Sequence, residues 1–229
     1  MANERPTAAA FVRRVLAEAA VFDDVRMLAI LDRASTDGTR AALEEVAREE
    51  PRLTVVWAPE NRGVVDAYVR GYREALATGM PWILEIDAGF SHDPADIAGF
   101  LPRMREGWDC IYGSRFCPGG RISDSGFGRR VVSWGGTKLT NLLIGTRLAD
   151  MTSGFQMFRR DALARILETG IRSRGPFFQT EMKVYSRRMR VVEVPIHYRA
   201  ASHAVGRAAI ADSLRQLGGL FRRRIAGTL

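Results

Sequence analysis

The chain has 229 residues, of which 46% are hydrophobic and 26% charged, as expected for one large or two small globular domains. No run approaches the ~20 apolar residues that a membrane-spanning helix needs, no signal-peptide pattern opens the sequence, and the two cysteines form no disulfide framework, so we expect a cytoplasmic protein. The net charge of +8 comes almost entirely from arginine and, without any nucleic-acid-binding motif, favours an anionic substrate or membrane face over nucleic acid, a solvated arginine surface being the alternative.

The spacing of apolar residues predicts helices that alternate with short strands up to residue 113. The expected elements, in order, are a helix at 8–20, a strand at 27–31, a helix at 38–50, a strand at 53–57, a helix at 64–78, a strand at 82–87, a helix at 94–105 and a strand at 109–113. This alternation favours an α/β fold with a mostly parallel sheet that helices cover on both faces.

The pattern changes after residue 113. Residues 114–130 are rich in glycine, serine and arginine and predict a long loop, which in a compact domain usually carries function or is disordered. The remaining expected elements are helices at 131–146, 161–168 and 179–189, strands at 153–158 and 191–198, and a basic amphipathic helix at about 208–224. Because no repeat or linker divides the sequence, we expect a single domain over residues 1–229.

One predicted strand ends at an acidic residue, Asp87, which a small-residue turn and then Pro94 follow. Ligands in open α/β sheets bind beyond the carboxyl ends of the strands. A carboxylate in that place can hold a divalent cation against a diphosphate. We therefore expect Asp87 at the centre of a binding site, with Asp32, at the end of the first predicted strand, beside the same ligand.

Seven short motifs, most of them at or next to the ends of predicted strands and helices, follow one another along the chain. They are 32–39 (DRASTDGT), 61–63 (NRG), 87–94 (DAGFSHDP), 113–115 (GSR), 150–155 (DMTSGF), 178–181 (FQTE) and 192–196 (VEVPI). Together they resemble glycosyltransferase family 2, in particular its dolichyl-phosphate mannose synthase-like branch, over about residues 3–200. The resemblance implies the Rossmann-like GT-A fold.

The resemblance also implies an activity. A hexose would pass, with inversion, from a nucleotide diphosphate sugar to a polyprenyl phosphate or to a glycan or lipid hydroxyl, while Mg²⁺ or Mn²⁺ neutralises the departing diphosphate. A hydroxyl acceptor would need a base, for which Glu181 and Asp150 are the candidates, whereas a phosphate acceptor would need none. The predicted helices 131–146 and 208–224 would rest on an anionic membrane face, on the inner side of the cell membrane. The sequence leaves a homo-oligomer open.

The site residues expected on these grounds fall into four groups. The catalytic group is Asp87, Glu181 and Asp150; the nucleotide-sugar group is Glu4, Asp32, Arg33, Arg62, Asp87 and Arg115; the acceptor or phosphate group is Arg121, Arg129, Arg130 and Gln179; and the metal group is Asp87 and Ser91.

Three positions depart from the family pattern. Gly89 stands where the second acid of the "DxD" motif belongs, so we expect either weaker metal binding or arginine side chains that neutralise the diphosphate. His92 is an alternative ligand or a structural hydrogen-bonding residue. Arg33 stands where the family has a carboxylate that accepts a hydrogen bond from the nucleobase. Because an arginine side chain cannot accept a hydrogen bond, the identity of the nucleobase in the donor is left undetermined. The first family strand is absent before Glu4, for which we favour a truncated start over a replacement segment or a degenerate protein. The alternative function is a weakened GT-A protein that binds nucleotide sugar or a partner without turnover.

Overall fold

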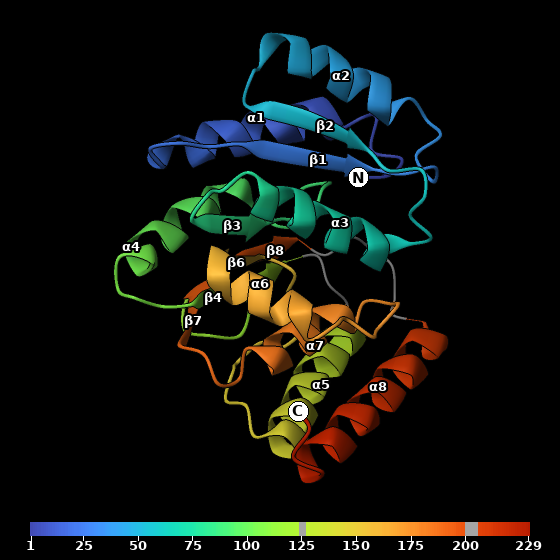
Figure 1. The fold of residues 1–229 in the computed structure, drawn as a ribbon, viewed down its shortest axis with the longest axis vertical. Helices are drawn as coiled ribbons and strands as arrows, with labels where there is room; N and C mark the ends of the chain where they lie inside the picture. Colours follow the sequence, from blue (N-terminus) through green and yellow to red (C-terminus); the bar gives the residue numbers. More distant parts are fainter. Residues whose placement is uncertain (124–126, 200–205) are drawn as a thin grey trace.

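The computed structural model describes residues 1–123, 127–199 and 206–229 (Figure 1). The helices are α1 (Ala8–Glu18), α2 (Thr39–Glu49), α3 (Val64–Ala77), α4 (Leu101–Met104), α5 (Phe127–Ile144), α6 (Arg160–Glu168), α7 (Phe178–Tyr185) and α8 (Arg207–Ile225), with short 3-10 helices η1 (Ala19–Val21) and η2 (Pro94–Phe100). The strands are β1 (Met27–Leu31), β2 (Leu53–Trp57), β3 (Trp82–Glu85), β4 (Cys110–Ser114), β5 (Arg121–Ser123), β6 (Gln156–Arg159), β7 (Val191–Pro195) and β8 (His197–Arg199).

The described strands form three hydrogen-bonded groups. β1 and β2 pair in parallel, β5 and β8 pair in parallel, and the main sheet has the order β3-β6-β4-β7. Within the main sheet β4 and β7 are parallel, whereas β6 runs antiparallel to both of its neighbours. β6 reverses because the chain re-enters the sheet at the carboxyl end of β4, where the Gly113 N–H donates to the Phe155 carbonyl. The predicted α/β class is confirmed, with β6 as the antiparallel strand.

Helices cover both faces of the main sheet because its strands bury apolar residues on both sides. In β4, Cys110 and Tyr112 join the core beneath α3 and α6, while Ile111 between them points to the opposite core beneath α1 and η2. This alternation is what an extended backbone imposes on successive side chains. Each such side chain, when fully buried, stabilises the fold by roughly 1.5–3 kcal/mol.

The β1–β2 pair adjoins the main sheet without joining it. Within the described residues β1 pairs only with β2, and β3 pairs only with β6. α1 spans the two groups, since Phe11 packs into the core of the main sheet and Leu16 into the core of the β1–β2 pair. On the opposite face α3 lies so close to β1 that a Cβ on Gly71 would lie 3.0 Å from Ile30 Cγ1. The absence of one family strand stays a prediction.

Several expected elements differ in detail. The helix expected at 131–146 is α5, which already begins at Phe127 inside the expected loop, and the helix expected at 179–189 ends at Tyr185. The strands expected at 82–87 and 153–158 are Trp82–Glu85 and Gln156–Arg159. The helix expected at 94–105 is the 3-10 helix η2 followed by one turn of α4, because Pro102 has no N–H to continue the hydrogen-bond ladder. The strand expected at 191–198 is divided at Ile196 into β7 and β8, and β8 pairs with β5 inside the expected loop. No helix in the described ranges is long and apolar enough to cross a bilayer.

Candidate active site

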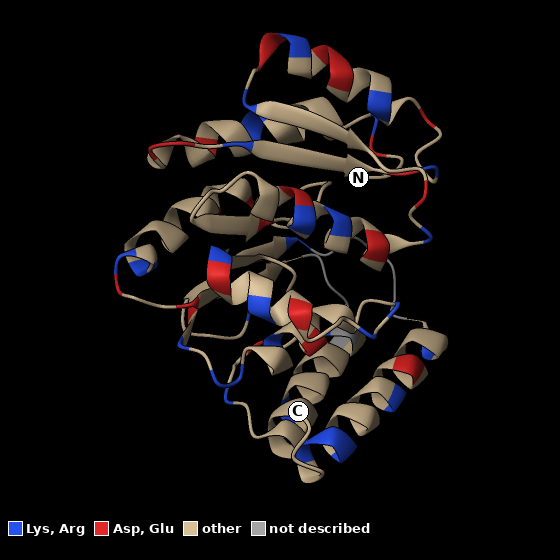
Figure 2. Ribbon diagram, in the orientation of Figure 1, with Lys and Arg blue, Asp and Glu red and all other residues tan. Residues whose placement is uncertain are grey.

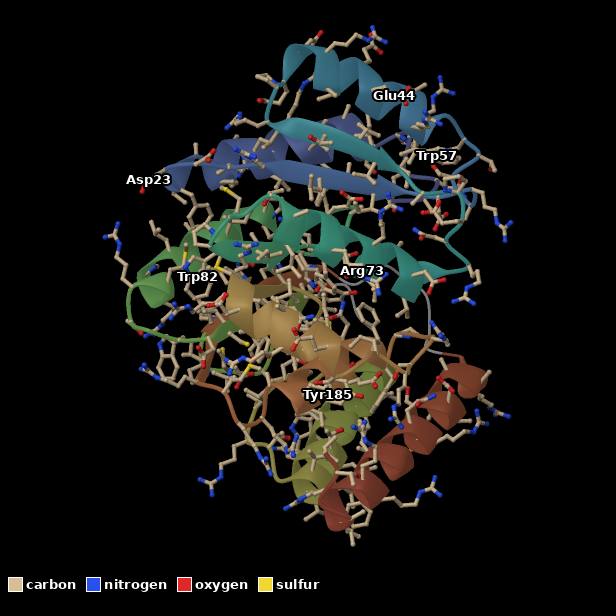
Figure 3. The ribbon with its side chains drawn as sticks, viewed as in Figure 1. Asp23, Glu44, Trp57, Arg73, Trp82 and Tyr185 are labelled. Carbon is tan, nitrogen blue, oxygen red and sulfur yellow. The ribbon has the colours of Figure 1, made fainter. Side chains whose placement is uncertain are left out.

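The acidic ends of β1 and β3 meet at one edge of the molecule. Trp82 marks the start of β3 and Trp57 marks the end of β2, and they lie on opposite sides of Figure 3. β1 is parallel to β2, so Asp32, which follows β1, lies on the side of Trp57. Asp87 follows β3 and lies at the same edge. This is the edge at which an open α/β sheet binds its ligand.

Asp87 is held in place by its neighbours but remains accessible. The Tyr68 hydroxyl donates to its Oδ1, and its own N–H donates to His92 Nδ1 at 3.4 Å. A Cβ on Gly154 would lie 3.4 Å from Asp87 Oδ2, so the backbone before β6 closely approaches the carboxylate. The side chain of Asp87 is nevertheless 35% exposed. It therefore presents a fixed negative charge to a ligand.

His92 is buried directly behind Asp87. Burial lowers the pKa of His92 to about 4, so the ring is neutral at pH 7. Because Nδ1 accepts from the Asp87 N–H, the proton of the neutral ring is on Nε2. The rings of Phe155 and Tyr198 flank it, each with its centroid 5.2 Å away. This geometry supports the structural hydrogen-bonding role of His92 over metal ligation.

A second buried carboxyl, Glu85, lies two residues before Asp87. It accepts from the Tyr72 hydroxyl and from the side-chain amides of Gln156 and Gln179. Burial and the charge of Asp87 raise the pKa of Glu85 to about 8, although these three donors oppose the shift. Sequence analysis missed Glu85, Tyr72 and Gln156. The available signal was a glutamate inside a buried apolar strand, because a charge there needs partners.

The raised pKa of Glu85 predicts a pH-dependent stability. Its value in the unfolded chain is near 4.5 and its folded value is about 8, so the folded protein binds the extra proton. The free energy of unfolding should therefore decline as the pH rises from 4.5 to about 8. The variant Glu85→Gln, which imitates the neutral acid, should lack this contribution to the decline. Urea unfolding across this range measures it, and equal pH slopes in both proteins would contradict it.

The turn after Asp87 brings the amino-terminal segment into the site. Gly89 has φ +80°, and a Cβ there would lie 3.1 Å from Glu4 Oε2 and 3.3 Å from Glu4 Oε1. The carboxylate of Glu4 therefore lies directly beside the backbone of Gly89. No group of three or more His, Cys, Asp or Glu in the described residues is arranged around a metal position. Two carboxylates with diphosphate oxygens and water still suffice for a hard divalent cation.

The other residues predicted to bind the nucleotide sugar differ in their exposure and in the partners that their side chains already have. Asp32 is buried, and its Oδ1 accepts from the Ala34 N–H at 2.9 Å, which shapes the loop after β1. Arg33 is exposed on that loop. Arg62 is exposed and pairs with Asp66 at 3.0 Å, a surface ion pair that a ligand can displace at little cost.

Arg115 and Asp150 form a buried ion pair. Arg115 Nε and Nη2 donate to the two Asp150 oxygens at 2.7 and 2.8 Å, and both side chains are nearly inaccessible. Lys183, also buried, donates to the Asp150 and Ser153 carbonyls at 3.2 and 2.7 Å. Burial lowers the pKa of Lys183 to about 8. The geometry therefore supports a structural role for Arg115 and Asp150 behind the site.

Glu181 is also occupied by internal hydrogen bonds. Its carboxylate is 1% exposed and accepts from the Arg172 and Ser173 N–H groups and from the hydroxyl of Tyr185, which Figure 3 labels on α7. These donors fix the loop before α7. The geometry therefore supports a structural role over that of a general base.

We expect Glu181→Gln to affect stability and not catalysis. The glutamine amide would place its own N–H donors against the backbone N–H donors of Arg172 and Ser173 and leave some of these donors without an acceptor. The free energy of unfolding should therefore fall by about 1–3 kcal/mol. The turnover rate should stay within about twofold, because no reacting atom is touched. Thermal unfolding and initial rates measured on the same preparation test this. A large rate loss at unchanged stability would instead restore Glu181 as a base.

The predicted acceptor-side residues lie around β5 and α7. Arg121 begins β5 and is exposed, Arg130 Nη2 donates to the Ile122 carbonyl at 2.8 Å, and the side chain of Arg129 lies outside the described residues. Gln179 is buried, with its amide on Glu85. Ser91 is half-buried, and its carbonyl accepts from the Arg199 N–H at 2.7 Å.

Solved structures share this fold over the whole chain. Mannosyl-3-phosphoglycerate synthase from Rubrobacter xylanophilus is similar with a TM-score of 0.67 and 20% identity, over 100% of this chain and 73% of that one. Glucosyl-3-phosphoglycerate synthase from Mycobacterium tuberculosis, solved with Mn²⁺, UDP and glucosyl-3-phosphoglycerate, is similar with a TM-score of 0.63 and 17% identity, over 99% of this chain and 75% of that one. The fold is therefore that of the GT-A glycosyltransferases.

The chain belongs to glycosyl transferase family 2, whose model matches residues 1–167. It is 34% identical over 171 residues to an undecaprenyl-phosphate mannosyltransferase from Micrococcus luteus, covering 74% of this chain and 70% of that protein. It is 31% identical over 172 residues to a polyprenol monophosphomannose synthase from Mycolicibacterium smegmatis, covering 74% of this chain and 65% of that protein. The chain thus spans about two thirds of the length of these relatives. The predicted family and branch are confirmed.

Proposed function

We propose that this glycosyltransferase moves a hexose from a nucleotide diphosphate sugar to a polyprenyl phosphate, with inversion, and that residues 1–229 act as one catalytic unit. The observation that carries the proposal is Asp87, an accessible carboxylate fixed by Tyr68 and His92 at the carboxyl end of β3. The names of the two curated relatives support the acceptor class. Because one is named a mannosyltransferase and the other a monophosphomannose synthase, turnover is favoured over binding without catalysis.

The state of the two candidate bases also supports a phosphate acceptor. Glu181 and Asp150 are buried, and each spends its carboxylate on internal donors. A hydroxyl acceptor needs a carboxylate that is free to take its proton. A phosphate acceptor is already an anion and needs no base. Its nucleophilic oxygen would attack the anomeric carbon while Asp87 holds the diphosphate side of the donor.

A divalent cation, Mg²⁺ or Mn²⁺, fits beside Asp87. When bound, it would neutralise the negative charge that develops on the departing diphosphate. Asp87 would hold it, with Ser91, the second ligand expected from the sequence, on the turn that follows. The Mn²⁺ in the solved glucosyl-3-phosphoglycerate synthase supports a metal in general, without deciding between the two ions.

The acceptor class implies contact with a membrane, and α5 has the face for it. α5 buries the hydroxyl side chains Thr137 and Thr140 and exposes large apolar ones, of which Trp134 is 53% and Leu142 77% exposed. α8 packs beside α5 and ends in the basic run 222–224, as the blue segment at its lower end in Figure 2 shows. Exposed apolar side chains beside positive charge match an anionic bilayer surface.

A donor and acceptor screen tests the proposed function. Nucleotide sugars that differ in base and hexose are offered with undecaprenyl phosphate in vesicles, with Mn²⁺ or with EDTA. Release of nucleoside diphosphate and formation of a polyprenyl phosphate sugar are the expected results. If none of the nucleotide sugars in the screen gives nucleotide release, the proposal is overturned in favour of the non-catalytic alternative.

The membrane contact has its own test. We expect the double variant Trp134→Ser/Leu142→Ser to bind phosphatidylglycerol-containing vesicles at least ~10-fold more weakly, because each apolar side chain contributes about 1.5–3 kcal/mol when buried. Vesicle co-sedimentation measures the binding. Val21→Ser, which removes a comparably exposed residue on η1, is the matched control. Unchanged sedimentation of the double variant would place the membrane contact elsewhere.

A further inference from the structure

Gly89 removes one carboxylate from the acidic motif after β3, yet the space beside it holds another. Gly89 has φ +80°, a conformation that glycine adopts without strain. The atoms nearest to a Cβ built there are Oε2, Oε1 and Cδ of Glu4, at 3.1, 3.3 and 3.5 Å. A side chain at position 89 would therefore press against the carboxylate of Glu4, which would have to shift slightly.

Several hydrogen bonds hold Glu4 in this position. Its N–H donates to Thr39 Oγ1 at 2.8 Å, and the neighbouring Arg5 N–H donates to Asp37 Oδ2 at 2.9 Å. Its carbonyl accepts from the Thr7 and Ala8 N–H groups at the start of α1. The loop after β1 and the first turn of α1 thus fix the backbone of Glu4.

The turn that carries Gly89 is anchored on the same helix. Phe90 adopts φ +61°, a conformation costly for a bulky side chain, and packs edge to face on Phe11 of α1 with ring centroids 5.2 Å apart. α1 therefore positions both Glu4 and the turn after Asp87. The contact between Glu4 and Gly89 is built from two sides of the site.

The charges around this point have the sign that a cation requires. The amino group of Met1 donates to the Ile30 carbonyl beside the site. Burial lowers the pKa of this amino group, while the charges of Asp32, Glu4 and Asp87 each raise it. The carboxylates of Asp32, Glu4 and Asp87 therefore all lie near the Met1 amino group.

From this geometry we infer that Glu4 supplies the carboxylate that Gly89 lacks, so that Asp87 and Glu4 together hold the divalent cation of the diphosphate. The inference rests on the proposed function and names a ligand for the same site. The positive φ of Gly89 favours glycine at this position. An aspartate at position 89 would be strained by that φ and would have to displace the Glu4 carboxylate, so it should weaken the site.

Mn²⁺ binding tests the inference without any donor sugar. The probe is Mn²⁺ with inorganic pyrophosphate, and the free Mn²⁺ signal in electron paramagnetic resonance reports the bound fraction. We expect Glu4→Gln, which keeps an oxygen for the Thr7 hydroxyl, to weaken Mn²⁺ binding at least ~10-fold. Glu44→Gln, which removes an exposed carboxylate on α2, should bind as the wild type does.

A carboxylate exchange makes the test reciprocal. Gly89→Asp alone should weaken Mn²⁺ binding, because the positive φ strains the aspartate and its side chain displaces Glu4. The double variant Glu4→Ala/Gly89→Asp should bind more tightly than either Glu4→Ala or Gly89→Asp. Wild-type affinity in Glu4→Gln, or no Mn²⁺ binding by the wild type, would overturn the inference. Neither result depends on turnover, so a failed donor screen with intact Mn²⁺ binding would overturn only the proposed function.

Discussion

Asp87→Asn should lower kcat/KM for the nucleotide sugar at least ~100-fold, the loss typical when one preorganised electrostatic group is removed from an active site. The amide has the shape of the carboxylate and still accepts from the Tyr68 hydroxyl, so the fold should be kept. What it lacks is the negative charge that faces the ligand edge. Initial rates of nucleotide release measure the effect.

The control for Asp87→Asn is a carboxylate of similar size away from the site. Asp161 is exposed in the first turn of α6, and Asp161→Asn should retain the wild-type rate. The melting temperatures of both variants should be compared to exclude unfolding. Full activity of Asp87→Asn would contradict the central place given to this residue.

Asp150→Asn should lower the free energy of unfolding by about 3–5 kcal/mol, the cost of leaving a buried charge without its counter-ion. Arg115 would then be a buried guanidinium that has lost two charge-assisted hydrogen bonds. Urea unfolding measures the loss. The double variant Arg115→Met/Asp150→Leu should recover part of the stability, because it removes the orphaned charge as well.

The Arg115–Asp150 ion pair also determines how the stability of the protein changes at acidic pH. Burial alone would raise the pKa of Asp150, but the charge and hydrogen bonds of Arg115 outweigh it and hold the pKa well below its usual range. The stability that this pair contributes is therefore present above the unfolded value of 3.8 and is lost as the pH falls below it. A stability of Asp150→Asn within about 0.5 kcal/mol of the wild type would contradict this account.

Sequence patterns predicted the elements that local chemistry determines. The strands at 27–31 and 53–57 were predicted to the residue, because short apolar runs between polar turns leave little choice of boundary. β5 was missed because three residues in a loop rich in glycine and arginine carry no apolar alternation. Its pairing depends on β8, which lies far along the chain.

In the candidate site, too, features with a local signal in the sequence could be predicted, whereas features that depend on the packing of distant segments could not. Asp87 could be predicted because a carboxylate after a buried strand is a local signal. The partners of Glu181 and Asp150 could not, because the sequence does not tell which donors the fold will bring to a carboxylate. At Gly89 the sequence shows the missing acid but not the approach of Glu4, which depends on how α1 packs, and weakened metal binding stays a prediction.

In the part of the chain that the structure describes, β1 and β3 share no backbone pairing, which bears on how the enzyme would respond to its substrate. Side-chain packing of α1 and α3 links the part that carries Asp32 to the part that carries Asp87, and Met27 of β1 also packs against the core of the main sheet. Regions that side-chain packing joins can open as separate cooperative units. A donor that touches both aspartates would act as a cross-link between these units, and the free energy of binding would couple their opening. The bound nucleotide sugar would then make the two units open and unfold together, in addition to serving as the substrate.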